Sequence, residues 1–170
     1  MKKVLFLLTI LSVISSCGSY NSINSFYNSH KNDVGVTAIH VPQYILSLLS
    51  NSSGDMNSFM NNVRDIRYIH LQPSNDTESN LIRNQINTLT TNRFVEVYRK
   101  NEEKTNTLIS VRENRDVVKE IIIYKNSEKS NSVFYLNGNF NPNTVREYIK
   151  SDRLENLTNN ILQQYNFIEK

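Results

Sequence analysis

The sequence is poor in the residues that several common kinds of site require. It has 1 Cys, 4 Gly, 3 Pro and no Trp among 170 residues. A single Cys excludes a disulfide framework and any zinc or iron–sulfur site built from several cysteines. The glycines lie far apart, so no glycine-rich phosphate-binding loop is present. With 38% hydrophobic residues, the chain has the length and composition of one domain with its own core.

The apolar run near the N-terminus is too short to span a membrane. Val4 to Ile14 makes 11 residues, whereas a membrane-spanning helix needs about 20. Lys2 and Lys3 precede this run and small residues follow it, a pattern typical of a secretory signal peptide. The sequence therefore predicts a signal peptide over residues 1–16.

The only cysteine follows directly. Ile14-Ser15-Ser16-Cys17 resembles the bacterial lipobox, in which the cysteine thiol receives a diacylglycerol and becomes the first residue after cleavage. The resemblance predicts lipidation of Cys17 and a membrane partner, because two or three acyl chains hold a protein on a bilayer. It implies a bacterial cell envelope protein, at the outer membrane or the periplasmic face. The alternative is an ordinary signal peptide that happens to end near a cysteine.

Charge gives no support for nucleic-acid binding. The formal net charge is +3, but removing residues 1–16 takes away Lys2 and Lys3. No block of basic residues with interleaved aromatics occurs elsewhere. We therefore expect no nucleic-acid partner.

Hydrophobic spacing divides the rest of the chain. Residues 17–25 are mostly small and polar, as in a lipidated N-terminus with a flexible tether. Spacings of three and four, or alternation, then predict a sequence of helices and strands. These are a helix at Ile23–His30, a strand at Val36–Val41, helices after Pro42 and around Met56–Val63, a strand at Ile66–Leu71 and a helix at Leu81–Leu89.

The second half changes to a period of two. Four short runs separated by turn residues predict an antiparallel meander, and Asn141-Pro142 then opens a helix. The expected fold over residues 26–150 is α+β, a mainly antiparallel sheet with helices packed on one face, preceded by two βα units. The first two strands are expected in one sheet with right-handed crossovers.

A C-terminal amphipathic helix is predicted over residues 151–170. Its apolar residues recur at steps of three and four, namely Leu154, Leu157, Ile161, Tyr165 and Ile168. Such a helix either docks on its own domain or pairs with another chain. Residues 151–170 are therefore the expected surface for a protein partner or for self-association.

Few residues qualify as catalytic or metal-binding groups. His40 and His70 occupy like positions in two predicted strands, but a zinc site needs at least three protein ligands. Glu102 and Glu103 are interpreted as a solvated hairpin tip rather than an acid–base pair. Gly138 is interpreted as a turn or positive-φ residue after a strand. We predict no catalytic, cofactor-binding or metal-binding residues and identify no small-molecule ligand.

The predicted order of elements resembles a bacterial lipoprotein family known as domain of unknown function 4252. Three stretches carry the resemblance, namely Phe26 through the strand and helix after Val34, Phe59–Leu71, and Phe94–Lys150 with its Leu136-Asn137-Gly138-Asn139-Phe140 segment. The resemblance implies the fold class and an envelope location, and it brings no activity or ligand. Members are often encoded near extracytoplasmic-function sigma factors, which implies envelope regulation.

These observations favour a lipid-anchored, non-enzymatic binding or regulatory module. The alternatives are an unrecognised envelope hydrolase or transferase and a self-associating structural lipoprotein. A hydrolase needs a nucleophile, a base and an orienting group, but the chain has no G-x-S-x-G motif. Numerous Asn and aromatic residues would also suit a glycan-binding surface, although several of the aromatics lie on predicted buried faces.

Overall fold

The computed structural model describes residues 22–42, 44–47, 57–91 and 93–168. The predicted signal peptide over 1–16 and the predicted lipidation site Cys17 lie outside these residues. Among the residues described, no helix is both long enough and apolar enough to cross a bilayer. The helices and strands are α2 (Ile23–His30), β1 (Val36–Val41), α4 (Asn57–Met60), β2 (Val63–Leu71), α5 (Asp76–Thr91), β3 (Val95–Asn101), β4 (Thr105–Asn114), β5 (Val117–Ser127), β6 (Asn131–Phe140), α6 (Pro142–Lys150) and α7 (Arg153–Ile168).

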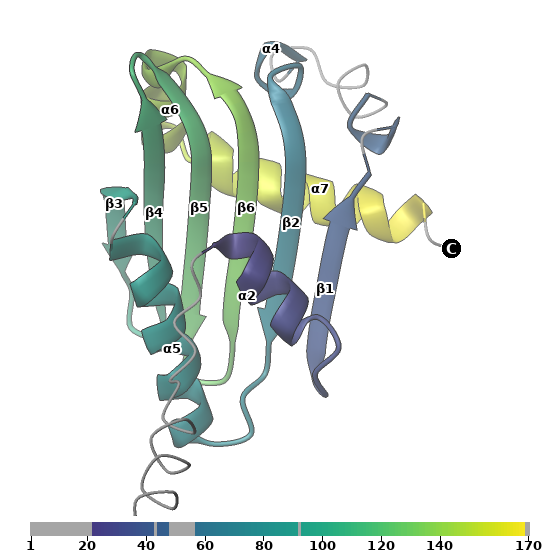
Figure 1. The fold of residues 1–170 in the computed structure, drawn as a ribbon, viewed down its shortest axis with the longest axis vertical. Coiled ribbons are helices and arrows are strands. Elements are labelled where there is room, and N and C mark those ends of the chain that lie inside the picture. The colour runs from purple at the N-terminus through teal and green to yellow at the C-terminus, as the bar shows by residue number, and fades with distance from the viewer. Residues whose placement is uncertain (1–21, 43, 48–56, 92, 169–170) are drawn as a thin grey trace, which may run out of the picture.

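One antiparallel sheet of six strands forms the centre of the fold (Figure 1). The strand order is β1-β2-β6-β5-β4-β3, and every neighbouring pair is antiparallel. Strands β3 to β6 follow one another as the predicted meander, and β6 then pairs with β2. The α+β class and the mainly antiparallel sheet are confirmed.

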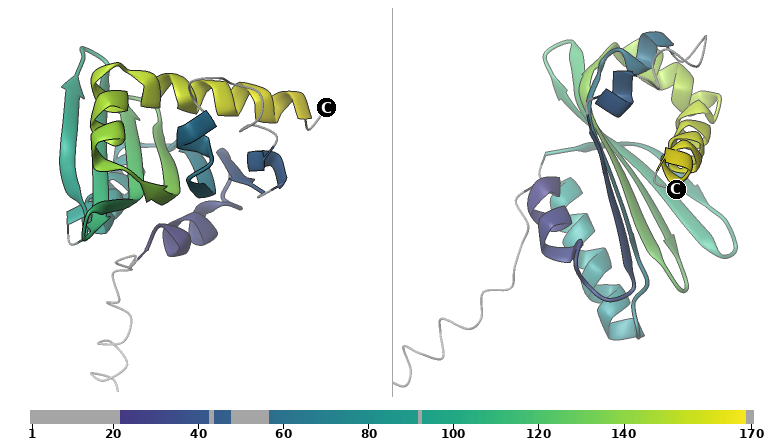
Figure 2. Two further views of the ribbon diagram at one scale, coloured as in Figure 1. Left: turned by 90° about the horizontal axis from the view of Figure 1, so that it is seen from above. Right: turned by 90° about the vertical axis from the view of Figure 1, so that its right-hand side faces the viewer.

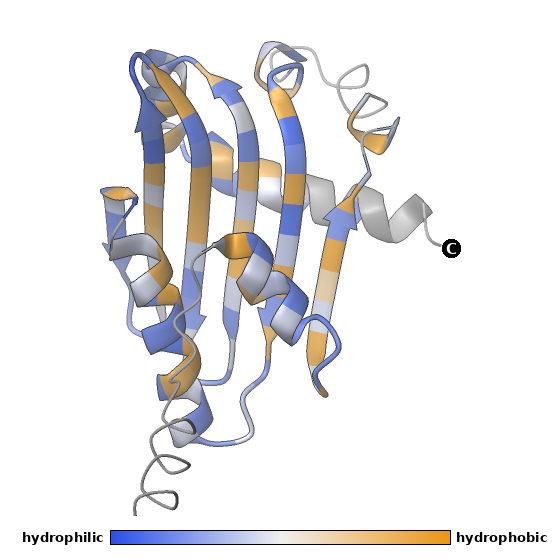
Figure 3. Ribbon diagram, in the orientation of Figure 1, coloured by the Kyte–Doolittle hydropathy of each residue, from blue (hydrophilic) through white to orange (hydrophobic). Residues whose placement is uncertain are grey.

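Helices cover both faces of the sheet, which corrects the expectation of one covered face. Figure 2 shows α2 and α5 on one side and α4, α6 and α7 on the other. The central strands are buried from both sides, so neighbouring residues of one strand pack into different hydrophobic cores. Ile122 and Tyr124 of β5 pack with α2 and α5, in the α5-side core, whereas Ile121 and Ile123 pack in the α7-side core. Figure 3 shows the resulting apolar segments along β4 and β5.

The first two strands are antiparallel neighbours rather than strands joined by a right-handed crossover. Val36 of β1 lies opposite Leu71 of β2, and Val41 lies opposite Ile66. The two strands do share one sheet, as predicted. The expected crossover was wrong because apolar alternation reports burial and carries no information about strand direction.

Helices form both ends of the described chain. Helix α2 begins at Ile23, as the hydrophobic spacing predicted, and so overlaps the expected tether of residues 17–25; Ile23 is buried, and Ser22 caps the helix by accepting from the Ser25 N–H at 3.2 Å. At the other end, Leu154 and Leu157 of α7 are buried in the α7-side core. The first turns of the C-terminal helix therefore dock on the domain.

Candidate functional site

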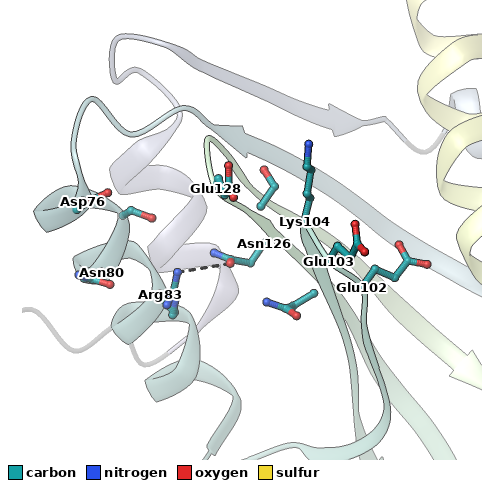
Figure 4. Close-up of a pocket in the computed structure, with 11 residues that line it drawn as sticks. Asp76, Asn80, Arg83, Glu102, Glu103, Lys104, Asn126 and Glu128 are labelled. Carbon is teal, nitrogen blue, oxygen red and sulfur yellow. Dashed lines mark hydrogen bonds between the residues drawn. The ribbon is translucent and has the colours of Figure 1, made fainter.

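A polar groove lies between α5 and the two hairpin ends of the meander. It consists of two adjoining cavities of about 370 and 450 Å³ that share Arg83, Asn106 and Asn126 in their walls. In Figure 4, Asp76, Asn80 and Arg83 of α5 lie on one side of the groove, and Glu102, Glu103 and Lys104 of the β3–β4 turn lie on the other. Asn126, near the end of β5, and Glu128, in the β5–β6 turn, lie between them. The antiparallel hairpins bring these segments together, although they are far apart in sequence.

The floor of this polar groove is a buried network of amides and one phenol. Asn126 and Asn131 lie opposite each other across the β5–β6 ladder, and both are buried. The Asn131 Oδ1 accepts from the Tyr124 hydroxyl at 2.7 Å and from the Asn126 Nδ2 at 2.5 Å. Arg83 donates to the Asn126 Oδ1 at 3.4 Å and connects the floor to α5. Such a network holds the groove in one shape, because each polar group that loses its partner carries a desolvation penalty.

The ion pairs at the rim of the groove keep their groups charged. Lys100 bonds to Glu102 at 2.7 Å, and this hydrogen bond and charge lower the pKa of the Glu102 carboxyl. Arg99 makes two hydrogen bonds to Glu96, at 2.8 and 2.6 Å, which raise the pKa of Arg99. These shifts move both groups away from neutral pH, whereas a general acid or base works best with a pKa near the operating pH. Glu102 lies in the turn between β3 and β4, so its predicted hairpin position is confirmed.

A second polar cluster occupies the same face of the sheet. We call Asp65, Arg67, Arg112, Glu120 and Tyr135 the sheet cluster. Arg67 donates to Asp65 at 2.8 Å, while Arg112 donates to Glu120 at 2.6 Å and the Tyr135 hydroxyl donates to Glu120 at 3.0 Å. The cross-strand register aligns these groups, since Arg112 lies opposite Glu120 on neighbouring strands.

The environment of Glu120 determines its charge. Burial raises the pKa of its carboxyl, but the hydrogen bonds from Arg112 and Tyr135 and the positive charges of Arg112 and Arg93 outweigh burial, so the pKa lies below its ordinary value. Burial and the nearby charge of Glu120 raise the pKa of Tyr135. Glu120 is therefore an ionised acceptor and Tyr135 a neutral donor at neutral pH.

The two histidines singled out in the sequence lie on opposite faces of the sheet. Thr37 is the partner of His70 and Arg67 is the partner of His40. Directly opposed residues share a face, and residues 37 and 40 are separated by an odd number of positions, so His40 and His70 face different cores. His40 instead contacts the Asp65 carboxylate at 2.8 Å. Within the described ranges, no group of three or more His, Cys, Asp or Glu side chains is arranged to hold a metal ion.

Most of these features lie in a region of the chain that matches a known protein family. The profile of the family described as Domain of unknown function (DUF4252) matches residues 27–148. The chain belongs to this family. The DUF4252 match runs from α2 into α6, so it contains all six strands, the polar groove and the sheet cluster, whereas α7 follows it. Comparisons with curated proteins and with solved structures found no match.

Sequence reasoning did not find the groove or the sheet cluster of this DUF4252 protein. A signal was present for the cluster, because Arg112 and Glu120 occupy strand positions on the same face as Leu108 and Ile122. Charged residues at positions that alternation assigns to a partly buried face indicate paired groups. The groove had no comparable signal, since Arg83 and Asn126 are 43 positions apart and meet only through the fold.

Proposed function

We propose that this protein is a lipid-anchored component of the bacterial cell envelope that acts as a non-enzymatic binding or regulatory module. The anchoring part of the proposal is based on the lipobox-like Ile14-Ser15-Ser16-Cys17 at the end of a short apolar segment. The family provides the fold and no activity, so the binding part depends on the geometry of the domain.

The observation that carries the binding role is the polar groove with its buried amide floor. The two cavities that form it are of the size that binds small ligands or a few residues of a polymer. Its walls are rich in amide groups that can both donate and accept hydrogen bonds, among them Asn80, Asn106 and Asn126. Its rim carries charges that stay charged at neutral pH, which supports recognition of a polar ligand rather than proton transfer.

Lipid attachment is tested by replacing the anchoring cysteine in a bacterium that processes lipoproteins. Cys17→Ser removes the thiol that would carry the lipid, so we expect the precursor to stay uncleaved and to incorporate no radiolabelled palmitate. The matched control is Ser16→Ala, which keeps a small residue before the cysteine and should leave labelling unchanged. Normal palmitate incorporation in Cys17→Ser would refute the anchoring proposal.

Groove binding is tested by photo-crosslinking in cells that produce the full chain. A benzophenone amino acid is placed at Asn80 or at Asn106, which come from α5 and β4 and face the same cavity. Leu81, the exposed neighbour of Asn80, does not line the groove and is the control position. We expect adducts of one common mass from Asn80 and Asn106 and none from Leu81. Identical labelling at all three positions, or none at the two groove positions, would contradict the proposal.

A further inference from the structure

Strand β3 forms one edge of the sheet and leaves large apolar side chains in solvent. It pairs with β4 on one side, and no strand within the described residues pairs with its other side. Val95 is 66% exposed and Val97 is 45% exposed. A cavity of about 340 Å³ adjoins this edge, with Val97 and Tyr98 of β3 and Val145 and Ile149 of α6 in its wall. An exposed edge strand with an apolar surface is a template for pairing with another strand.

The charges on β3 do not protect this edge from pairing. Lysine and arginine usually keep edge strands apart by repulsion. Here Arg99 is held by Glu96, and Lys100 is held by Glu102 in the adjoining turn. Each cation is therefore balanced on its own chain, and the edge presents no excess of positive charge to an approaching strand.

The order of residues in β3 makes the strand complementary to itself. An acidic residue, Glu96, comes before Arg99, so antiparallel pairing of two copies can place Glu96 of each opposite Arg99 of the other. Both residues lie on the α5 side of the sheet, because they pair with Ser110 and Leu108, which share one face of β4, and Leu108 packs against the α5-side core. The same register places Val97 opposite Tyr98 of the second copy. Parallel pairing would instead bring like charges together.

We propose that two copies of this protein associate through their β3 strands, paired antiparallel with Glu96 opposite Arg99, so that the two sheets become one continuous sheet. The interface is isologous, since the same residues contribute from both copies. Pairing satisfies the unpaired backbone groups of both edges and covers Val97. The surface differs from the one expected at residues 151–170, because Leu154 and Leu157 are already buried within their own domain.

This arrangement is compatible with two anchors in one bilayer, a point that rests on the proposed function. In a continuous antiparallel sheet, opposite residues share a face, so the α5 side of both copies faces the same way. Helix α2 lies on that side and begins at Ile23, six positions after Cys17. Both lipids would therefore reach the same membrane. Confinement on a membrane also raises the effective concentration of the pairing surfaces.

The test uses full-length protein in detergent, with two different affinity tags on co-purified copies. We expect wild-type copies to co-purify and to sediment as dimers in analytical ultracentrifugation. Glu96→Arg alone and Arg99→Glu alone place like charges opposite each other and should weaken association about tenfold or more. A mixture of Glu96→Arg with Arg99→Glu should restore it, because every cross-strand contact then joins opposite charges.

The mixture separates pairing between copies from effects inside one chain. Mixing does not repair the Glu96–Arg99 contact within either variant, so recovery is explained only by contact between copies. The control is Asp116→Arg, an exposed charge reversal in the β4–β5 turn that should leave association unchanged. The proposal would be overturned by a monomeric wild type, by association that neither charge reversal weakens, or by a mixture of the two variants that does not recover association. None of these results bears on palmitate incorporation at Cys17, which tests the proposed function separately.

Discussion

Gly138 lies in the interior of β6, where a close backbone contact requires a glycine. A Cβ built on Gly138 would lie 2.1 Å from the carbonyl oxygen of Asn62 and 2.7 Å from the ring of Phe140. The approach is fixed by the Asn139 N–H, which donates to the same Asn62 oxygen at 3.0 Å. The expectation of a turn or positive φ at Gly138 was wrong, because the residue is extended and pairs with Val63 in the β2–β6 ladder.

We expect Gly138→Ala to lower the free energy of unfolding by about 3 kcal/mol, because the added methyl group meets backbone that cannot rotate away. The matched control is Gly35→Ala, where the Cβ would have only ordinary contacts at 3.6 Å but φ is +76°. That strain alone should cost about 1 kcal/mol. Urea denaturation followed by circular dichroism measures both changes, and equal losses would contradict the close-contact explanation.

Glu120 gives a pH-dependent contribution to stability. Its pKa is lower in the folded protein than in the unfolded chain, so its contribution is fully present above the ordinary pKa of 4.5 and is lost as the pH falls through the folded value. Glu120→Gln should therefore be less stable than wild type at pH 7, by about 1–3 kcal/mol. The difference should shrink as the pH falls below about 5. Denaturation curves across this range test it, and a difference independent of pH would contradict the assignment.

At the scale of elements, local pattern predicted where helices and strands occur better than where they end. Phe59, Met60 and Val63 have helical spacing, but α4 ends at Met60 and Val63 begins β2. Val63 belongs to the strand because it pairs with Gly138 of β6, which lies 75 positions later in the sequence. The helix after Asn141 was predicted well, since its cap is local, with the Asn141 Oδ1 accepting from the Asn143 N–H at 2.9 Å.

The docking of α7 is testable with two substitutions in the same helix. Leu157 is 2% exposed in the α7-side core, so Leu157→Ala should lower the free energy of unfolding by about 2–4 kcal/mol. The exposed neighbour Asn156 is the control, and Asn156→Ala should change stability by less than about 0.5 kcal/mol. Thermal and urea denaturation measure both. An unchanged stability in Leu157→Ala would show that the start of α7 contributes nothing to the core.

At the scale of the whole molecule, one sheet serves two cores. Alternate residues of β5 point to opposite faces of the sheet and pack into different cores, so the apolar run Ile121–Tyr124 is buried from both sides. From the sequence, such runs were expected to form strands with one covered face. Alternation between polar and apolar residues would have indicated that one face of the sheet is exposed to solvent. The absence of such alternation in β5 was the available signal that both faces are buried.

The sequence alone determined the class of fold, the meander and most of the elements, because hydrophobic period depends on which local positions are buried. It is also the only basis for predicting a signal peptide and a lipid on Cys17, since that motif is linear. Tertiary structure decided the strand order, the partner of His40, the reason for Gly138 and the polar groove. Each of these depends on which strands pair and in which register, and contacts between residues tens of positions apart leave no trace in local spacing.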